Sequence, residues 1–137
     1  GELIRQRGHE YGTVTKRARR TGWFDAVVVN QSRRMSSLTG ISLMLLDVLS
    51  GFETLKICTA YKYKGEIIHG LPATVKGIEE VEPVYEEMPG WNEDITNVKS
   101  FEELPVNCQN YIIHCPIVMF SVGPDRNQTV VLKEIEF

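Results

Sequence analysis

The sequence of 137 residues has few cysteines, no long apolar run and no glycine-rich phosphate-binding motif. Its cysteines, Cys58, Cys108 and Cys115, form no C-x-x-C pair, so we expect small, reduced, buried thiols and a cytoplasmic protein without a metal centre. No apolar run reaches the roughly 18 residues of a membrane helix, so we expect no membrane partner. The motif G-x-x-x-x-G-K-[ST] is also absent, so nucleotide phosphates would have to be held partly by residues outside this sequence.

The charge of the chain is small in total but uneven along the sequence. The net charge is −3, with arginines concentrated before Met35 and acidic residues concentrated in Glu79–Glu103. Nucleic-acid binding needs a broad basic face, so this distribution argues against it. A hydrophobic content of 42% and a charged content of 24% indicate an ordinary globular protein. We expect one domain over residues 1–137, and a fragment or an excised domain of a longer protein, because Gly1 already lies in amphipathic sequence.

One polar segment, Glu10–Trp23 (EYGTVTKRARRTGW), here called the cationic loop, has the composition of an anion-binding site. Thr13 and Thr15 offer hydroxyl groups and backbone amides. Arg17 and Arg19 alternate, so both point to one side if the segment is extended. A guanidinium binds a carboxylate or phosphate through two parallel hydrogen bonds. The loop therefore indicates a small anionic ligand, although such charge runs more often form a solvated face or a nucleic-acid patch.

Hydrophobic periodicity and turn residues predict a mixture of helices and short strands. The first helix is expected to stop at Gly8, and the helix that follows the cationic loop is expected to point its N-terminal amides toward a bound anion. We predict helices at Glu2–His9, Trp23–Met35 and Val106–Ile113, and strands at Ile41–Leu49, Leu55–Tyr63, Glu66–His69, Val81–Met88, Pro116–Val122 and Thr129–Phe137.

Asp47 interrupts the apolar run Ile41–Leu49, which we predict to be a buried strand. Burying an unpaired carboxylate is costly, so this residue has a specific role. It either caps a turn at Ser50–Gly51 or lies at the carboxyl end of a parallel strand, where α/β proteins place ligand contacts. A carboxylate there can accept hydrogen bonds from guanine N1–H and the 2-amino group, a donor pair that adenine lacks.

The turn after the strand Pro116–Val122 is a second candidate for ligand contacts. Gly123-Pro124-Asp125-Arg126 is a sharp turn. Exposed amides and carbonyls at Ser121–Gly123 could contact a ligand at the end of the strand, and the alternative is a plain connecting turn.

Several of these segments together resemble the adenylosuccinate synthetase family. GHEYGTVTKRARRTGW resembles the family's aspartate and inosinate loop, LTGISLMLLDVLSG its guanine-contacting segment, and SVGPDRNQTV a segment near its C-terminus. The matches occur in the family's order, cover nearly the whole chain and fit only the C-terminal portion of the enzyme. The resemblance implies an α/β fold, the C-terminal part of a P-loop-NTPase-like architecture with a mixed sheet and few flanking helices.

The resemblance also implies a function in purine biosynthesis. The family is a carbon–nitrogen ligase that joins IMP and L-aspartate into adenylosuccinate at the expense of GTP, with Mg²⁺, as a cytoplasmic homodimer on the route to AMP. Its glycine-rich phosphate loop, general base and catalytic aspartate lie in the N-terminal part. We therefore expect no catalytic residue and no metal ligand in this chain, which alone is expected to be inactive.

By the same resemblance, two groups of residues would bind the substrates. Arg17 would also reach the inosinate ribose, and Arg19 would help to bind the GTP phosphates. The aspartate-binding residues would be Thr13, Val14, Thr15, Lys16, Arg17 and Arg19, and the remaining GTP-binding residues would be Leu45, Leu46, Asp47, Ser121, Val122 and Gly123.

The sequence departs from the family pattern at two of these positions. Lys16 stands where the family has a glycine, and Leu45 stands where it has a lysine. The segment between Cys108 and Pro116 is also shorter than is usual. These differences favour an alternative, a divergent non-catalytic paralogue that binds nucleotide weakly or only packs as a subunit. An RNA-binding module ranks last, because the chain lacks a broad basic face and an aromatic platform.

Overall fold

The computed structural model describes residues 1–113 and 117–133. Its contacts divide the chain into two compact units, each built from segments that are distant in the sequence. The expectation of one domain stays a prediction, and each unit is described by itself. None of the described helices is long and apolar enough to cross a membrane. Unit 1 comprises Gly1–Gly22, Gly40–Leu55 and Pro89–Phe137, and unit 2 comprises Trp23–Thr39 and Lys56–Met88.

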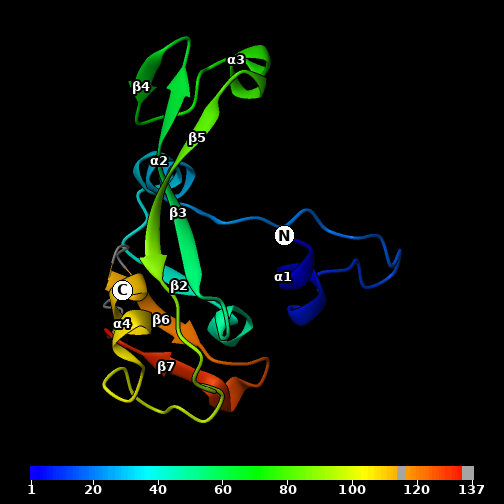
Figure 1. The fold of residues 1–137 in the computed structure, drawn as a ribbon, viewed down its shortest axis with the longest axis vertical. Helices are drawn as coiled ribbons and strands as arrows, with labels where there is room; N and C mark the ends of the chain where they lie inside the picture. The colour runs from blue at the N-terminus through cyan, green and yellow to red at the C-terminus, as the bar shows by residue number, and fades with distance from the viewer. Residues whose placement is uncertain (114–116, 134–137) are drawn as a thin grey trace. The chain divides into compact units, whose positions relative to one another are not determined.

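Unit 1 is organised around a small mixed sheet (Figure 1). Strand β6 (Ile117–Ser121) lies in the middle, parallel to β2 (Ile41–Leu43) and antiparallel to β7 (Thr129–Val131). Phe120 and Ser121 of β6 are fully buried. The mixed sheet confirms the predicted fold class. The helices of this unit are α1 (Glu2–Arg7), η1 (Leu46–Leu49), α4 (Val106–Ile113) and η2 (Arg126–Gln128).

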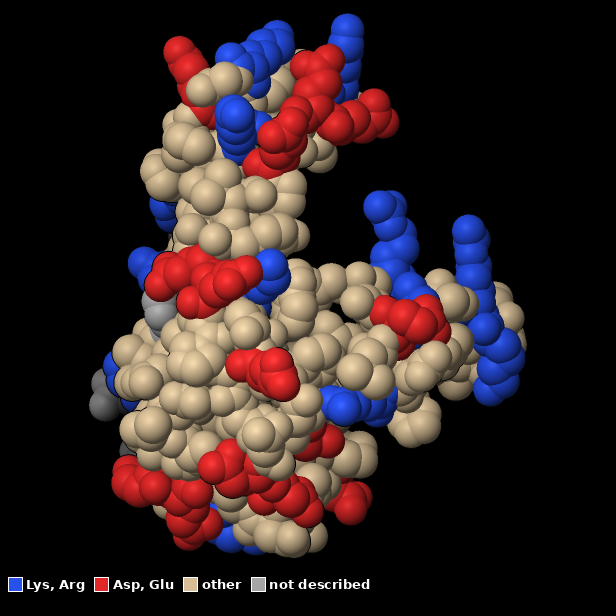
Figure 2. Space-filling view, viewed as in Figure 1, with Lys and Arg blue, Asp and Glu red and all other residues tan. Residues whose placement is uncertain are grey.

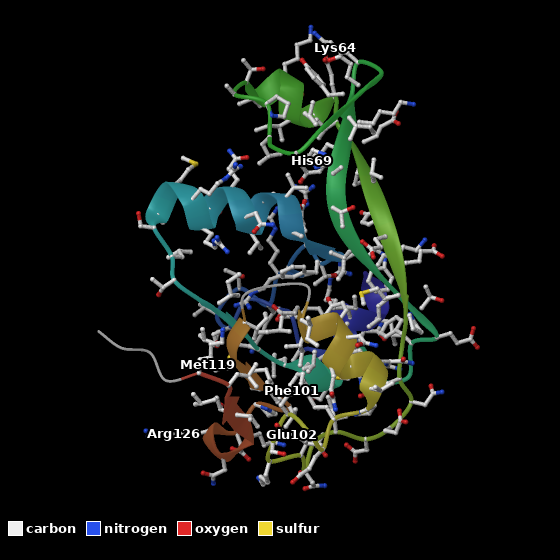
Figure 3. The ribbon with its side chains drawn as sticks, turned by 90° about the vertical axis from the view of Figure 1, so that its left-hand side faces the viewer. Lys64, His69, Phe101, Glu102, Met119 and Arg126 are labelled. Carbon is white, nitrogen blue, oxygen red and sulfur yellow. The ribbon has the colours of Figure 1, made fainter. Side chains whose placement is uncertain are left out.

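Unit 2 is organised around the long strand β3 (Thr54–Tyr63), whose first two residues belong to unit 1. A tight hairpin joins β3 to β4, because Lys64 and Gly65 both adopt positive φ, 50° and 90°. Figure 3 labels Lys64 at the tip of this hairpin. The other elements of the unit are β1 (Phe24–Asp25), parallel to β3, β4 (Glu66–Ile68), antiparallel to β3, β5 (Glu82–Pro89), which also pairs with β3, α2 (Ala26–Ser36) and α3 (Val75–Glu79).

The predicted strand Ile41–Leu49 is wrong beyond its first residues. Only Ile41–Leu43 is extended, because Leu45 adopts a left-handed conformation with φ of 58° and the chain then turns into η1. A left-handed residue cannot continue a strand. The turn lets Leu46 and Val48 face the core, so the continuous apolar run reflects one short strand and one buried turn.

The helix after the cationic loop begins later than predicted, at Ala26, because Asp25 caps it. Oδ1 of Asp25 accepts a hydrogen bond from the amide of Val28 at 3.0 Å, and Oδ2 accepts one from the hydroxyl of Tyr61. The prediction that the amides of this helix end face a bound anion is therefore wrong at Val28. Burial, together with this hydrogen bond, raises the pKa of Tyr61.

The strand Leu55–Tyr63 is confirmed, but its two faces are not as different as its alternation predicts. Cys58 is buried as well as Tyr61, and both pack with Val27 of α2. Burial also raises the pKa of the Cys58 thiol, with a further contribution from the Asp25 carboxylate. A helix against one face and a second strand beside it therefore bury the centre of β3.

The other sequence-based expectations divide between confirmed elements and elements outside the description. The helix Val106–Ile113 is confirmed, and helix α1 ends at Arg7 with Gly8 as its cap. Cys58 and Cys108 are free and buried, as expected. Cys115 and the end of the predicted strand Thr129–Phe137 lie outside the described residues.

Candidate functional site

The cationic loop is closed at its base by backbone hydrogen bonds. Tyr11 and Ala18 form an antiparallel bridge, and the amide of Gly12 donates to the carbonyl of Arg17 at 2.8 Å. Beyond this base, the amide of Lys16 donates to the carbonyl of Gly12 at 2.9 Å. Val14 is 91% exposed at the tip. The loop is thus an ordered hairpin-like turn that leaves its side chains open to solvent.

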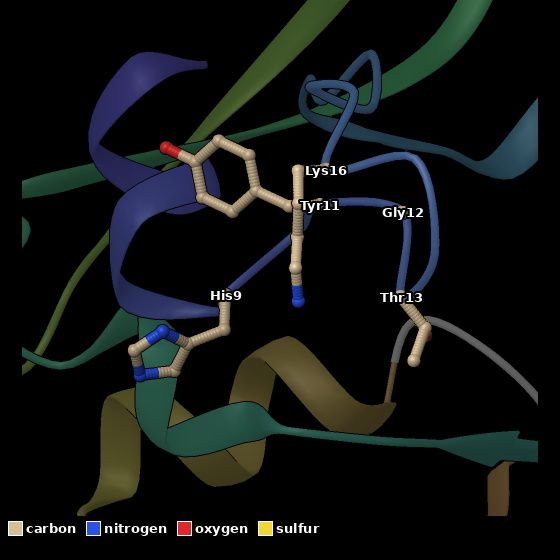
Figure 4. A pocket seen from close by; sticks show the side chains of 5 residues that line it. All are labelled: His9, Tyr11, Gly12, Thr13 and Lys16. Atoms are coloured by element: carbon tan, nitrogen blue, oxygen red, sulfur yellow. The ribbon is translucent and has the colours of Figure 1, made fainter.

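Side chains at the start of this loop line a hollow of about 410 Å³ (Figure 4). Its lining combines two predicted site residues, Thr13 and Lys16, with two aromatic rings that were not predicted to contribute, His9 and Tyr11. Figure 4 shows the ammonium of Lys16 directed into the space between His9 and Thr13. A hydroxyl group and an ammonium in one hollow suit a small anion.

The two arginines expected in the site have different surroundings. Nη1 of Arg19 lies 2.9 Å from Oε2 of Glu10, and the backbone carbonyl of Arg19 accepts from Nε of Arg5 at 2.8 Å. Among the residues that the structure describes, none forms an ion pair with the guanidinium of Arg17. Cationic side chains stand out from the loop in the space-filling view (Figure 2). Arg17 is therefore open to an incoming carboxylate, whereas Arg19 has an internal partner.

Lys16 occupies a backbone position that suits glycine. Its φ is 55°, a region that costs a residue with a Cβ about 1–2 kcal/mol. We expect Lys16→Gly to raise the free energy of unfolding by about 1 kcal/mol, measured by urea denaturation. Lys16→Ala is the matched control, because it removes the same charge but keeps the Cβ. An equal gain from both variants would attribute the effect to charge and contradict the backbone explanation.

The turn that carries Asp47, Met44–Gly51, here called the Asp47 turn, follows the carboxyl end of β2. Oδ1 of Asp47 is buried and has no hydrogen-bond partner among the described residues. Burial raises the pKa of this carboxyl, the amides of Asp47 and Val48 partly oppose the rise, and Asp94 adds to it. A buried carboxylate oxygen without a donor is costly, so the geometry suits a ligand that brings N–H donors.

The alternative role for Asp47, capping the turn at Ser50–Gly51, has no support in the hydrogen bonds. The amide of Ser50 donates to the backbone carbonyl of Asp47 at 3.1 Å, and the amide of Gly51 donates to the carbonyl of Trp91 at 2.7 Å. The turn is closed by backbone groups, and Oδ1 of Asp47 takes no part in closing it.

The structure brings the two predicted GTP-binding segments together. The amide of Leu45 donates to Oγ of Ser121 at 2.7 Å, and Ser121 is fully buried. The prediction that Ser121–Gly123 exposes its backbone is wrong, because all three residues are buried and the amide of Val122 donates to the carbonyl of Gln128. The hydroxyl of Ser121 instead satisfies the backbone where Leu45 adopts its left-handed conformation.

We expect Ser121→Ala to lower the free energy of unfolding by about 1–3 kcal/mol, because it leaves the amide of Leu45 without its partner. Urea denaturation measures the change. Ser42→Ala is the matched control, since Ser42 lies exposed on β2 and should show almost no effect. Equal stability of the two variants would contradict the role of this hydrogen bond.

Two residues that were not predicted to contribute, Arg7 and Trp91, hold the Asp47 turn in place. Nη1 of Arg7 donates to the carbonyls of Val48 and Ser50, and Nε1 of Trp91 donates to Oγ of Ser50 at 2.9 Å. Each of these contacts spans about forty residues, so no local pattern could have revealed them. The only signal was the cluster of cations that includes Arg7 just before the cationic loop.

The described residues offer no ligand set for the implied Mg²⁺. In residues 1–113 and 117–133, no three His, Cys, Asp or Glu side chains come together to hold a metal ion. The donor chemistry of this part of the chain therefore does not fit a resident metal.

Comparisons with known proteins identify relatives over nearly the whole chain. The family described as adenylosuccinate synthetase matches residues 1–130. The chain is 55% identical to adenylosuccinate synthetase of Geobacillus sp. (strain WCH70) and 57% identical to that of Listeria innocua serovar 6a, over 98% of this chain and 33% of each relative. It also resembles a solved structure of fully ligated adenylosuccinate synthetase from Plasmodium falciparum, with a TM-score of 0.91 and 41% identity over 97% of this chain and 34% of that one. The chain thus spans about a third of the length of these relatives.

Proposed function

Because the chain belongs to the adenylosuccinate synthetase family, we propose that it supplies the aspartate-binding and guanine-nucleotide-binding portion of a GTP-dependent ligase. The complete enzyme would join IMP and L-aspartate into adenylosuccinate, with phosphoryl transfer to the purine 6-oxygen creating the group that the aspartate amine displaces. The Mg²⁺ contacts and most phosphate contacts would come from the rest of the enzyme, which would act as a cytoplasmic homodimer. The observation that carries this proposal is the buried, unpartnered Oδ1 of Asp47.

The chemistry of Asp47 supports a guanine site. Guanine N1–H and its 2-amino group point the same way, and a carboxylate can accept both hydrogen bonds. The low-dielectric surroundings that raise the pKa of Asp47 also strengthen any hydrogen bond that the carboxylate accepts. The hydrogen bond from the amide of Leu45 to Oγ of Ser121 joins the segment that carries Asp47 to the second predicted GTP-binding segment. Leu46, Val122 and Gly123 would complete the proposed base site.

The cationic loop supports an aspartate site. Thr13 and Thr15 would donate to a substrate carboxylate, and Arg17 would bind it with two hydrogen bonds and reach the inosinate ribose. Val14 and Lys16 would complete the loop around the substrate. Arg19 is less available to a ligand than Arg17, because Glu10 already pairs with the guanidinium of Arg19. Arg19 would have to exchange that partner before it could contact a GTP phosphate.

Calorimetric titration of the chain with GDP, with ADP as the control, tests the proposed base site. Heat with GDP and none with ADP is expected, because adenine cannot donate two hydrogen bonds to Asp47. Equal heat with both nucleotides would contradict base reading by this residue. If GDP gives no heat, Leu45→Lys restores the family residue. Binding gained by this variant would favour the alternative function below, whereas continued absence of binding would show that phosphate contacts from outside the chain are required.

The alternative function is a divergent, non-catalytic paralogue. Two observations favour it: Lys16 adopts a positive φ where the family has glycine, and Leu45, which precedes Asp47 by two residues, is apolar where the family has lysine. This alternative predicts that restoring both family residues, with Lys16→Gly and Leu45→Lys, increases nucleotide affinity. The ligase function predicts that the unmodified residues already support binding.

A further inference from the structure

We infer that Arg7 is a positioning residue that fixes the Asp47 turn and connects it to the cationic loop. The inference rests on the proposed function, because it concerns how the base-reading carboxylate is held. Arg7 is the last residue of α1 and has no place in the predicted substrate contacts. Its importance comes from the carbonyl groups that it reaches.

The guanidinium of Arg7 contacts two carbonyl groups of the Asp47 turn and the ring of Phe52, the residue that directly follows the turn. Nη1 donates to the carbonyl of Ser50 and, at 3.4 Å, to the carbonyl of Val48. Its Cζ lies 5.1 Å from the centre of the Phe52 ring. A planar guanidinium can donate to carbonyl oxygens and stack on a ring at the same time, which a lysine ammonium does poorly. Arg7 is thus matched in shape as well as in charge to this turn.

The contacted carbonyls control the position of Asp47. The last carbonyl groups of a short helix have no partner within the helix, so an outside donor decides their orientation. Val48 directly follows Asp47, and the amide of Ser50 donates to the carbonyl of Asp47. A cation at the C-terminal end of η1 also complements its dipole. Loss of Arg7 would therefore release the backbone on one side of Asp47.

Helix α1 also contacts the cationic loop, through a different arginine. Nε of Arg5 donates to the carbonyl of Arg19 at 2.8 Å, next to the pair formed by Arg19 and Glu10. One six-residue helix therefore contacts the proposed base site through Arg7 and the proposed aspartate site through Arg5. Arg5 is a matched control, because its removal eliminates the same charge from the same helix but leaves the Asp47 turn untouched.

The test compares Arg7→Met, Arg7→Lys and Arg5→Met in the full-length enzyme. Arg7→Met is expected to raise the KM for GTP about tenfold and to lower the preference for GTP over ATP, with a smaller change in kcat and in the KM for aspartate. Arg7→Lys keeps the positive charge but loses the planar guanidinium with its several N–H donors, so it should raise the KM for GTP less than Arg7→Met does. Arg5→Met is expected to change the KM for aspartate more than that for GTP.

Hydrogen exchange provides a readout that does not depend on activity. In Arg7→Met and Arg7→Lys the amides of residues 48–51 are expected to exchange faster than in the parent, while those of Arg5→Met are unchanged there. Unchanged exchange in Arg7→Lys and Arg7→Met would overturn the inference. Because Arg7→Lys retains the cation, it keeps the test decisive if Arg7→Met fails to fold.

Asp47→Ala, measured in the same series, separates failure of the inference from failure of the proposed function. If Asp47→Ala leaves the GTP preference unchanged, the proposed base site is wrong. If Asp47→Ala lowers the preference but Arg7→Met changes neither that preference nor the KM for GTP, the positioning role is overturned. When both roles are correct, Arg7→Met adds little to the loss of preference in an Asp47→Ala background.

Discussion

Replacement of Arg17 by leucine in the full-length enzyme is expected to raise the KM for aspartate on the order of 100-fold and the KM for GTP only a few-fold. The guanidinium of Arg17 has no ion-pair partner among the described residues, so its charge is available to the substrate carboxylate. Removing it leaves that carboxylate without its paired donors, which costs far more than losing a solvated charge. Steady-state kinetics with each substrate varied in turn measure the difference.

Arg20→Leu is the control for this result. Arg20 lies exposed in the same loop and carries the same charge, so its removal measures how far the overall positive potential of the loop contributes to substrate binding. We expect nearly parental KM values for this variant. If Arg17→Leu raises the KM for aspartate and the KM for GTP by the same factor, the specific role of Arg17 is contradicted and a general loss of loop structure is indicated.

The second large effect concerns Asp47. Asp47→Ala is expected to lower the preference for GTP over ATP by about 10- to 100-fold, the discrimination that one good bidentate contact to a base provides. The ratio of kcat/KM values for the two nucleotides measures this preference. Phosphate binding should persist, so ATP should be used about as well as by the parent enzyme. A poorer use of both nucleotides to the same extent would indicate a structural role for Asp47.

Asp94→Ala is the matched control for Asp47→Ala. The Asp94 carboxylate contributes to the raised pKa of Asp47, yet its own hydrogen bonds go to the amide and hydroxyl of Thr96. These bonds lower the pKa of Asp94 and occupy its side chain. We therefore expect Asp94→Ala to keep the GTP preference. Loss of preference in this variant would show that the local charge, and not the contact by Asp47, selects the base.

The sequence predicted best those elements that short-range chemistry determines. The hairpin at Lys64–Gly65 needs only two residues that adopt positive φ, and the helix Val106–Ile113 follows from its apolar spacing after Pro105. The strand prediction for Ile41–Leu49 was wrong because the conformation of this segment depends on a partner that is distant in the sequence. Leu45 adopts its left-handed conformation where Ser121, 76 residues away, accepts from its amide.

The same division applies to the candidate site. The family resemblance pointed to Asp47 and Arg17 as site residues. The structure adds that Oδ1 of Asp47 is buried without a hydrogen-bond partner and that the guanidinium of Arg17 has no ion-pair partner among the described residues. Arg7 and Trp91 could not be predicted, because their contacts with Ser50 depend on the tertiary fold. Sequence patterns show which chemical groups are present, whereas the residues that orient those groups are identified only from tertiary contacts.

The interleaving of the two units has a consequence for the order in which the protein folds during its synthesis. Unit 2 has all its segments once the ribosome has added Met88, but unit 1 still lacks β6 and β7 at that point. More than thirty further residues must therefore be synthesised before the amide of Leu45, in the Asp47 turn, can donate its hydrogen bond to Oγ of Ser121. Because such distant contacts form late, the nascent protein can acquire its hairpin unit well before its candidate ligand site.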